Sequence, residues 1–476
     1  MSPGQVALPS GRARPTVLVA LVAAFCGGPV AAPPPALPRL GVSADGRSLV
    51  REDGVPFFYL ADTAWAIFHK TRRDEAERYL DDRRRKGFDV IQASITAAGF
   101  WPGLGPNAMG DIPFRDRDPR RPNEAFFAYV DTVIAAAAAR GLYVALLPTW
   151  GEYVCPAWQN GPKIFDLGTA RAYGAWLGRR YRGATNLIWV LGGDRRPDEC
   201  GPGDVEVWRS LAEGLLEGLG PEASRALLTY HPRGGTHSST LLHREPWLSF
   251  DLFQSSHCRN SPNYEMVALD RALAPPKPTL DGEPVYEHIP SCLLRGAPRI
   301  DAHDVRKAAW WSVLAGAAGH AYGASEVFSF WRPGEDDHGG WFATPWSEAL
   351  GYPGATAMGH LRRLLESRSW PTLVPDPDLV AAPRPNPAGD DHVSAARAAD
   401  GAWALVYVPT GHPIAVDLTR LSAERIRARW YDPRDGTSRE STESAADGAP
   451  TFTPPSSGPD ADWVLVLDRV GAARPP

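Results

Sequence analysis

Apolar strand-like runs alternate with amphipathic stretches from about residue 41 to 366, and this alternation constrains the fold most. Eight of the runs are apolar nearly throughout, as is typical of parallel strands buried on both faces. They cover residues 55–61, 89–95, 142–148, 187–191, 226–230, 249–254, 278–281 and 320–323. The alternation therefore predicts an α/β fold built around a parallel sheet.

Seven helices are expected between and after these strands, each with apolar residues at helical spacing. They cover residues 74–86, 123–140, 169–182, 204–219, 264–273, 303–318 and 355–367. Asn123 is placed to cap one helix, and Gly87 and Gly141 are placed to end two others. The link at 236–243, between the fifth and sixth strands, is too short and polar for an eighth long helix.

The number of strands distinguishes between two kinds of parallel sheet. Eight units in about 320 residues favour a closed (β/α)8 TIM barrel over an open doubly wound sheet. No Gly-x-Gly-x-x-Gly motif follows the first strand, which removes the main nucleotide-binding alternative. We assign the barrel to residues 41–368.

The character of the chain changes after residue 368. Short β-like runs cover residues 403–408, 414–418, 426–431 and 463–467, and Gly, Pro, Asp and Ser fill the intervals. No helical period stands out there. The pattern predicts a small antiparallel β-sandwich over residues 369–476.

The first 32 residues have the pattern of an export signal. Arg12 and Arg14 precede an apolar stretch at 15–26, and small residues at 29–32 suit cleavage. A lipoprotein signal that uses Cys26 is a weaker alternative. Residues 33–40 form a Pro-rich linker. We expect a secreted or periplasmic protein without a membrane span, since no later run reaches about 18 apolar residues.

Charge and cysteine content limit the partners. The formal net charge of −5 argues against nucleic acid as a partner. Cys155, Cys200, Cys258 and Cys292 allow three disulfide pairings, and isolated thiols are the alternative. No Cys-x2-Cys pair occurs, so the cysteine spacing fits no zinc pattern. We also expect no other metal and no cofactor.

Two carboxylates follow Gly at the ends of predicted strands. Asp194 ends the fourth strand and Glu283 follows the seventh, at the barrel end where such enzymes keep their chemistry. Strands four and seven lie on opposing sides of the barrel mouth. A facing pair of carboxylates is what glycoside hydrolysis requires. The sequence thus predicts Asp194 and Glu283 as catalytic residues.

Each assignment has an alternative. Asp194 is followed by Arg195 and Arg196, and the alternative for it is an ion pair with a neighbouring arginine. Glu283 competes with Asp281 and Glu287 in the same segment. Asp281 is still within the strand and is a candidate for burial, whereas Glu287 lies one turn farther out and is a candidate for contact with substrate. Period-two alternation places Asp281 and Glu283 on one face of the strand. Glu283 is favoured over Glu287 because it is nearer the strand end.

Aromatic and polar residues after other strands complete a predicted sugar site. Sugar faces stack on aromatic rings, and polar groups fix the hydroxyls. The aromatic candidates are Trp65, Trp101, Trp150, Trp331 and Trp341. The polar candidates are Asp62, Glu152, His231, Gln254, His257, Glu287 and Glu326. Structural roles are the alternative for the two histidines.

Several segments resemble the apiosidase-like glycoside hydrolases. They are Asp62-Thr-Ala-Trp65, Gly192-Gly-Asp194 and the segment 281–287 with sequence DGEPVYE. Segments 428–436, 452–455 and 462–467 resemble the module once labelled a putative collagen-binding domain of a collagenase. The resemblance implies a TIM barrel with retaining chemistry, Asp194 as acid/base and Glu283 as nucleophile.

The chain departs from one common pattern of retaining barrel glycosidases. Many of them carry Asn-Glu after strand four, whereas this chain carries Gly193-Asp194. A group from elsewhere must then bind the 2-hydroxyl of the sugar.

These observations predict a secreted retaining glycoside hydrolase that acts on a plant-type or other complex polysaccharide. One alternative is a non-catalytic carbohydrate-binding barrel. Another is a protease or matrix-binding protein. Neither His-Glu-x-x-His nor Gly-x-Ser-x-Gly occurs, so protease chemistry lacks its parts. Collagen binding by the sandwich alone stays an open alternative.

Overall fold

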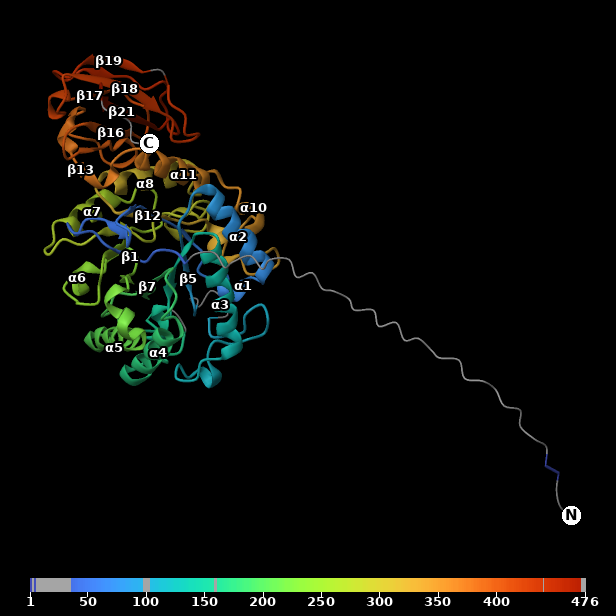
Figure 1. The fold of residues 1–476 in the computed structure, drawn as a ribbon. Helices are drawn as coiled ribbons and strands as arrows, with labels where there is room; N and C mark the ends of the chain where they lie inside the picture. Colours follow the sequence, from blue (N-terminus) through green and yellow to red (C-terminus); the bar gives the residue numbers. More distant parts are fainter. Residues whose placement is uncertain (2–3, 6–35, 97–102, 158–160, 440, 472–476) are drawn as a thin grey trace. The chain divides into compact units, whose positions relative to one another are not determined.

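The computed structural model describes residues 1, 4–5, 36–96, 103–157, 161–439 and 441–471 (Figure 1). The predicted export signal therefore lies almost entirely outside the described residues, and so does Trp101. Residues 36–476 form one compact unit. None of the helices in the described ranges is long and apolar enough to cross a membrane.

Eight parallel strands form the predicted barrel. They are β4 (Tyr59–Thr63), β5 (Val90–Ser94), β6 (Tyr143–Leu147), β7 (Leu187–Gly192), β8 (Leu228–His231), β10 (Asp251–Gln254), β11 (Thr279–Asp281) and β12 (Gly319–Tyr322). Strand β12 pairs with β4, and the Thr229 hydroxyl donates to the Phe250 carbonyl (2.7 Å) where β8 meets the segment before β10. The ring is therefore closed, as the strand count predicts.

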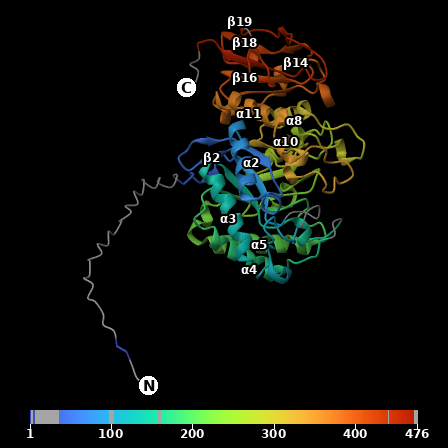
Figure 2. The same ribbon diagram turned by 90° about the vertical axis from the view of Figure 1, so that its right-hand side faces the viewer.

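Helices cover the outside of this sheet (Figure 2). The long ones are α2 (Arg73–Lys86), α3 (Glu124–Ala139), α4 (Leu167–Arg180), α5 (Pro202–Leu219), α7 (Asn263–Arg271), α8 (Ala302–Leu314) and α11 (Pro353–Glu366). The Asn123 side chain accepts a hydrogen bond from the Ala125 N–H, and Gly87 ends α2 with a φ of 94°. All seven expected helices are present, and α8 ends four residues early.

Two stretches of the barrel differ from the sequence pattern. The apolar run at 55–61 is divided between β3 (Pro56–Phe57) and β4. Strand β3 forms a small antiparallel sheet with β1 (Leu40–Val42) and β2 (Leu49–Arg51), so one apolar run serves two sheets.

The short link between the fifth and sixth barrel strands also has structure. It holds β9 (Thr236–His237), which pairs antiparallel with β10, and the one-turn helix α6 (Ser239–Leu242). Three further short helices lie in loops: α1 (Ile67–Lys70), α9 (Ser325–Ser329) and α10 (Trp346–Ala349).

The C-terminal region contains two antiparallel sheets, as predicted. The larger sheet holds β13 (Leu373–Pro375), β15 (Ser394–Ala398), β16 (Trp403–Val408), β21 (Trp463–Arg469), β18 (Arg425–Tyr431) and β19 (Thr442–Ala445). The smaller holds β14 (Val380–Ala382), β17 (Ile414–Val416) and β20 (Thr451–Phe452). Five of these strands were not foreseen, because most are only two to five residues long.

Helix α8 connects this region to the barrel. Arg306 of α8 makes two hydrogen bonds to Asp462 (2.9 and 2.8 Å), and both side chains are buried. Trp310 stacks on Tyr407 with a centroid distance of 5.9 Å. The barrel and the sheets are therefore joined through a buried interface.

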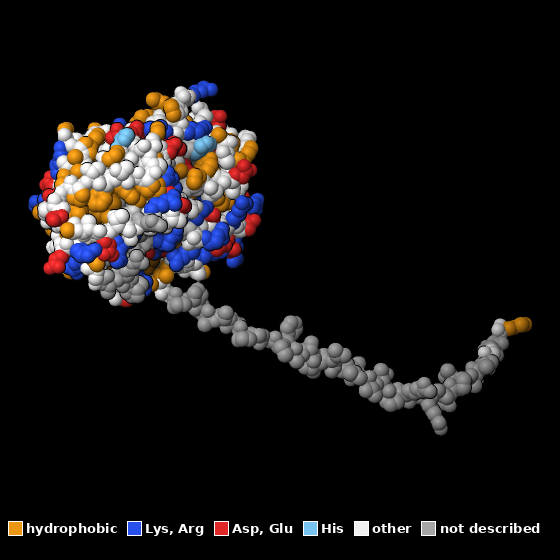
Figure 3. All heavy atoms as spheres, turned by 90° about the horizontal axis from the view of Figure 1, so that it is seen from above, with side chains coloured by type: hydrophobic (Ala, Val, Ile, Leu, Met, Phe, Trp, Pro, Cys, Tyr) orange, Lys and Arg blue, Asp and Glu red, His pale blue; other side chains and the backbone are white. Residues whose placement is uncertain are grey.

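The surface carries charges of both signs. In Figure 3 basic and acidic side chains are interspersed on the visible face.

Candidate active site

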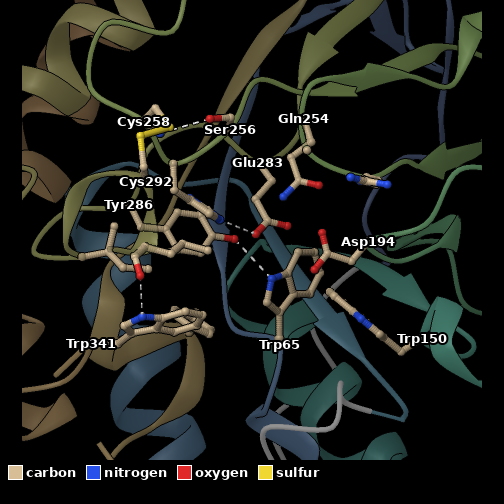
Figure 4. A pocket seen from close by; sticks show the side chains of 16 residues that line it. Trp65, Trp150, Asp194, Gln254, Ser256, Cys258, Glu283, Tyr286, Cys292 and Trp341 are labelled. Carbon is tan, nitrogen blue, oxygen red and sulfur yellow. Dashed lines mark hydrogen bonds and ion pairs between the residues drawn. A yellow bond between two sulfur atoms is a disulfide. The ribbon is translucent and has the colours of Figure 1, made fainter. Parts of the chain in front are cut away.

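A cavity of about 560 Å³ opens at the carboxyl ends of the barrel strands (Figure 4). Its lining comes from the loops and strand ends after β4, β6, β7, β8, β10, β11 and β12. The lining residues are Trp65, Trp150, Asp194, Arg233, Gly234, Gln254, Ser256, His257, Cys258, Glu283, Tyr286, Ile289, Cys292, Leu293, Phe328 and Trp341. The position is that of the active site in (β/α)8 enzymes.

A tight turn after β7 presents Asp194 to the cavity. Gly192, Gly193 and Asp194 have φ values of 86°, 108° and 56°, all in the left-handed region that favours glycine. A Cβ atom at Gly192 would lie 2.3 Å from the His231 carbonyl oxygen, and one at Gly193 would lie 2.9 Å from the Trp150 ring. The two glycines are therefore needed for this approach of the chain to its neighbours.

A second glycine turn presents Glu283. The N–H of Gly282 donates to the Phe253 carbonyl (2.9 Å), and the Gly282 carbonyl accepts from the Gln92 side chain (2.8 Å). A Cβ atom at Gly282 would lie 2.5 Å from the Leu252 side chain. Gly282 is thus fixed on both sides, and the next residue projects into the cavity.

Asp281 lies within β11 and is fully buried, in agreement with the sequence expectation, but it does not share a face with Glu283. Its carboxylate accepts hydrogen bonds from the Ser255 N–H (3.2 Å) and from the Asn263 side chain of α7 (3.1 Å). It does not line the cavity. Strand β11 ends at Asp281, so the alternation that placed Asp281 and Glu283 on one face is interrupted at Gly282.

Two histidines flank the Glu283 carboxylate. His231 Nε2 lies 2.9 Å from one oxygen, and His257 Nε2 lies 3.1 Å from the other. Burial alone would raise the pKa of Glu283, but the hydrogen bonds and charges of the two imidazoles outweigh it and lower the pKa to about 2. Glu283 is therefore ionised throughout the ordinary pH range.

Asp194 faces Glu283 across the cavity in Figure 4 and has a different environment. Burial, followed by the negative charge of Glu283, raises the pKa of Asp194 to about 6, although His231, His257 and Arg195 act in the opposite direction. Arg195 donates three hydrogen bonds to the backbone carbonyls of Asp194, Cys155 and Pro156. Asp194 can therefore hold a proton in mildly acidic solution.

Aromatic side chains form one wall around the pair. Trp65 and Trp150 meet edge to face with centroids 5.2 Å apart, and the Trp65 ring lies 5.4 Å from the His231 ring. Trp65 Nε1 donates to the Tyr286 hydroxyl (3.2 Å). These rings offer apolar faces beside the two carboxylates, which suits a sugar ring.

Among the predicted substrate-binding residues, five line the cavity: Trp65, Trp150, Gln254, His257 and Trp341. His231 is fully buried behind Glu283. Trp101 lies outside the described residues.

The other predicted binding residues do not line the cavity. Asp62 is fully buried and accepts hydrogen bonds from Tyr79 (2.5 Å) and Arg83 (2.8 Å) of α2. Glu287 accepts from the Tyr322 hydroxyl (2.6 Å) and from the Gly354 N–H of α11 (3.1 Å). Both carboxylates connect the barrel to its helices instead of facing the cavity.

Glu152, Glu326 and Trp331 also lie outside the cavity lining. Glu152 is fully buried. Glu326 accepts hydrogen bonds from His288 (2.8 Å) and from the Ala343 N–H (3.0 Å), so it shapes the loop that carries Trp341. The Trp331 indole donates to the Asp336 carbonyl (3.1 Å). A position shortly after a strand in the sequence is therefore not enough to place a side chain in the cavity.

Several lining residues were not foreseen. Tyr286 lies within the 281–287 segment that the sequence already singled out, so its aromatic ring was a usable signal. The others are Arg233, Gly234, Ser256, Ile289, Leu293 and Phe328. Phe328 lies in the short helix α9 and the rest lie outside the helices and strands named above, where neither periodicity nor a motif marks them.

The four cysteines among the described residues form two disulfides, Cys155–Cys200 and Cys258–Cys292. The first connects the loop after β6 with the loop after β7, and the second connects the loop after β10 with the loop after β11. Only the second lines the cavity. Each disulfide therefore braces a loop that follows one of the two carboxylates.

Two groups of side chains among the described residues are close enough together to be compared with a metal site. One includes the bonded cysteines Cys155 and Cys200, and the other consists of Asp301, His303 and Asp460, which lie where α8 meets the C-terminal region. None of the three lines the cavity.

Comparison with known proteins identifies the family. The model described as "Apiosidase-like, catalytic domain" matches residues 43–372, and "Putative collagen-binding domain of a collagenase" matches residues 374–468. No curated protein sequence matches the chain significantly.

Solved structures agree with this match. A structure titled "Glycoside hydrolase" shares 32% identity at a TM-score of 0.83, covering 92% of this chain and 98% of its own. A glycoside hydrolase family 5 protein from Bacteroides vulgatus shares 32% identity at a TM-score of 0.82, covering 91% and 94%. Since the family model spans more than half of the sequence, this chain belongs to the apiosidase-like family of glycoside hydrolases.

Proposed function

We propose that the protein is a secreted retaining glycosidase in which Glu283 is the nucleophile and Asp194 is the general acid/base. The observation that carries the proposal is the contrast between the two facing carboxylates. Glu283 is paired with two imidazoles, which favours its ionised form, whereas burial favours the protonated form of Asp194. A retaining glycosidase needs these two states before the reaction begins.

In the first step, Glu283 Oε attacks the anomeric carbon. The bond from that carbon to the leaving oxygen breaks, and Asp194 transfers its proton to this oxygen. The products are the departing alcohol and a glycosyl ester on Glu283. The aromatic wall of Trp65 and Trp150 supports the sugar ring during the attack.

In the second step, the Asp194 carboxylate accepts a proton from water while the water oxygen attacks the anomeric carbon. The ester bond breaks, Glu283 leaves as a carboxylate, and the sugar departs with its original anomeric configuration. The side-chain amide of Gln254, which points toward Glu283 in Figure 4, is a suitable partner for the 2-hydroxyl.

The substrate we propose is a plant-type or other complex polysaccharide, with an apiosyl linkage as the first to test because of the family description. A cavity of about 560 Å³ falls in the range of small-ligand sites. Secretion is supported by the two disulfides, since such bonds persist mainly in oxidising compartments.

The test is a panel of aryl glycosides and plant polysaccharides with NMR detection of the first-formed anomer. We expect hydrolysis of at least one glycoside, with retention. A first product of inverted configuration contradicts the double displacement. Specific sugar binding without hydrolysis of any member of the panel would instead favour the non-catalytic carbohydrate-binding barrel.

A further inference from the structure

The two histidines beside Glu283 are held in different ways. His231 is the last residue of strand β8 and lies against the Trp65 ring, so the sheet fixes it. His257 follows β10 by three residues and lies in an irregular loop. Its Nε2 contacts Glu283, and its Nδ1 is buried without a hydrogen bond to any described residue. The His257 ring also packs against the buried Tyr286 ring, with centroids 4.6 Å apart. The loop backbone and this ring contact together determine where the His257 ring lies.

A covalent link fixes this loop. Cys258, the next residue, is bonded to Cys292 in the loop after β11, with Cα atoms 4.1 Å apart. The Cys292 N–H donates to the His257 carbonyl (2.8 Å). The disulfide and this hydrogen bond therefore join the same two loops at two adjacent residues, Cys258 and His257.

The backbone around the link is in a conformation that these residues rarely adopt. Ser256, Cys292 and Leu293 have φ values of 99°, 56° and 60°, although each carries a Cβ atom. Such conformations are disfavoured and persist where surrounding structure enforces them. The Cys258–Cys292 bond is the covalent constraint at this place, so its removal allows the loop to relax.

We propose that the Cys258–Cys292 disulfide is a positioning element for the reaction, because it holds His257 against Glu283. The inference rests on the proposed function, in which Glu283 is the nucleophile. His257 and the disulfide act through Glu283 and are positioning residues. Without the disulfide, the loop moves, the hydrogen bond from His257 is lost, and Glu283 is both less well oriented and easier to protonate.

The groups that face Glu283 define the expected pH effect. They are His231 from β8, His257 from the loop after β10, Asp194 from the turn after β7 and Tyr286 from its own loop. Of these, His257 is the group directly next to a bonded cysteine, Cys258, so it is the one that the proposal moves. Loss of the bond should therefore leave one imidazole instead of two beside the carboxylate.

The first test compares two matched variants, Cys258→Ala/Cys292→Ala and Cys155→Ala/Cys200→Ala. The first should move the acid limb of the kcat/KM profile to higher pH by about one unit or more. It should also lower kcat/KM at pH 5 about tenfold, because the nucleophile is misoriented. The second should leave the acid limb in place. Equal acid limbs in both variants would overturn the proposal.

A second test asks whether the disulfide acts through His257. In a His257→Ala background, loss of the Cys258–Cys292 bond should produce no further shift of the acid limb, because the group it positions is already absent. A further shift of the size seen in the wild-type background means that the bond acts by another route, and it contradicts the assignment.

A third test does not depend on activity. Protein labelled with ¹³C at the glutamate carboxyl is titrated by NMR, and the Glu283 signal is identified by its absence in Glu283→Gln. We expect its pKa to be higher in Cys258→Ala/Cys292→Ala than in the wild type. An unchanged value in a folded variant overturns the proposal. A raised value in a protein that hydrolyses no glycoside would reject the proposed function, and with it the role in the reaction, while still showing that the disulfide holds His257 against Glu283.

Reduction provides the same comparison if the double variant does not fold. In Cys155→Ala/Cys200→Ala, Cys258–Cys292 is the disulfide left among the described residues. Dithiothreitol gives it two electrons and two protons, so two thiols form and the reagent closes to its cyclic disulfide. The acid limb should shift on reduction and return on reoxidation. No shift after two thiols have been counted contradicts the proposal.

Discussion

Asp194 and Glu283 occupy equivalent positions on the two sides of the cavity, yet their surroundings differ. Each follows a glycine at the end of a barrel strand, and each is followed by a loop that a disulfide braces. Glu283 lies between the imidazoles of His231 and His257. Burial and the charge of Glu283 have the largest effects on the pKa of Asp194.

This difference teaches that the neighbours, more than the carboxylates themselves, assign the roles. The pKa of Glu283 falls to about 2 and that of Asp194 rises to about 6, although both side chains carry the same functional group. Environments that separate two carboxyl pKa values in this way are typical of an acid and a nucleophile.

The largest expected effect comes from exchanging the carboxylates for amides. Glu283→Gln should lower kcat/KM by about 10⁴-fold or more for every substrate, because no covalent ester can form. Asp194→Asn should lower it about 10²–10⁴-fold for poor leaving groups. It should lower kcat/KM much less for 2,4-dinitrophenyl glycosides, which need no proton.

Azide, a small external nucleophile, provides a further test of which role each carboxylate has. In Asp194→Asn, azide should replace water in the second step and give a glycosyl azide of retained configuration. In Glu283→Gln, azide should attack directly and give the inverted product. The reverse assignment of products, read from the NMR coupling of the anomeric proton, would exchange the two roles.

The sequence predicted where the two carboxylates lie in the barrel better than it predicted which residues contact them. Alternation of apolar runs and helices placed Asp194 and Glu283 at strand ends, because that placement depends on local pattern and strand order alone. The disulfide pairing and the contacts of His231 and His257 with Glu283 join segments that are distant in the chain. No local pattern encodes such contacts.

Irregular backbone explains the other differences. Strand periodicity grouped Asp281 with Glu283, but the strand ends before Gly282 and the two carboxylates point to different neighbours. Glu287 is four residues beyond Glu283, yet it contacts Tyr322 and the first turn of α11. Periodicity holds only within an element, so side chains in loops could not be oriented from sequence.

The second prediction concerns His231, the histidine beside Glu283 that strand β8 carries. His231→Gln removes the imidazole 2.9 Å from the carboxylate and should lower kcat/KM about tenfold to hundredfold, because a buried charge loses one of its two close partners. The acid limb should move to higher pH because the pKa of Glu283 rises. An unchanged limb in a folded variant would show that His231 does not hold the carboxylate ionised.

The third prediction concerns the alkaline limb. Asp194 must carry a proton in the first step, and its pKa is about 6, so kcat/KM should fall tenfold per pH unit above about pH 6. The acid limb follows Glu283, whose protonation near pH 2 removes the nucleophile. Asp194→Asn should abolish the alkaline limb while the acid limb persists. A limb that survives in this variant belongs to another group.

The smallest expected effect on kcat/KM belongs to Asp62, a third carboxylate near the carboxyl end of a barrel strand. It faces Arg83 and Tyr79 of α2, and Arg83 is itself fully buried. Asp62→Asn leaves that guanidinium without its buried counter-charge, which should cost about 3–5 kcal/mol of unfolding free energy. Arg83 keeps a hydrogen bond to Asp82 (2.7 Å), so the lower end is expected.

Urea unfolding measures the loss of stability, and active-site titration corrects kcat/KM for the folded fraction. Corrected values should match the wild type, because Asp62 does not line the cavity. A raised KM with unchanged stability would instead place Asp62 in contact with substrate. The contrast with Glu283→Gln then separates a carboxylate that holds the barrel to its helices from one that faces the sugar, although both lie near the carboxyl end of a barrel strand in the sequence.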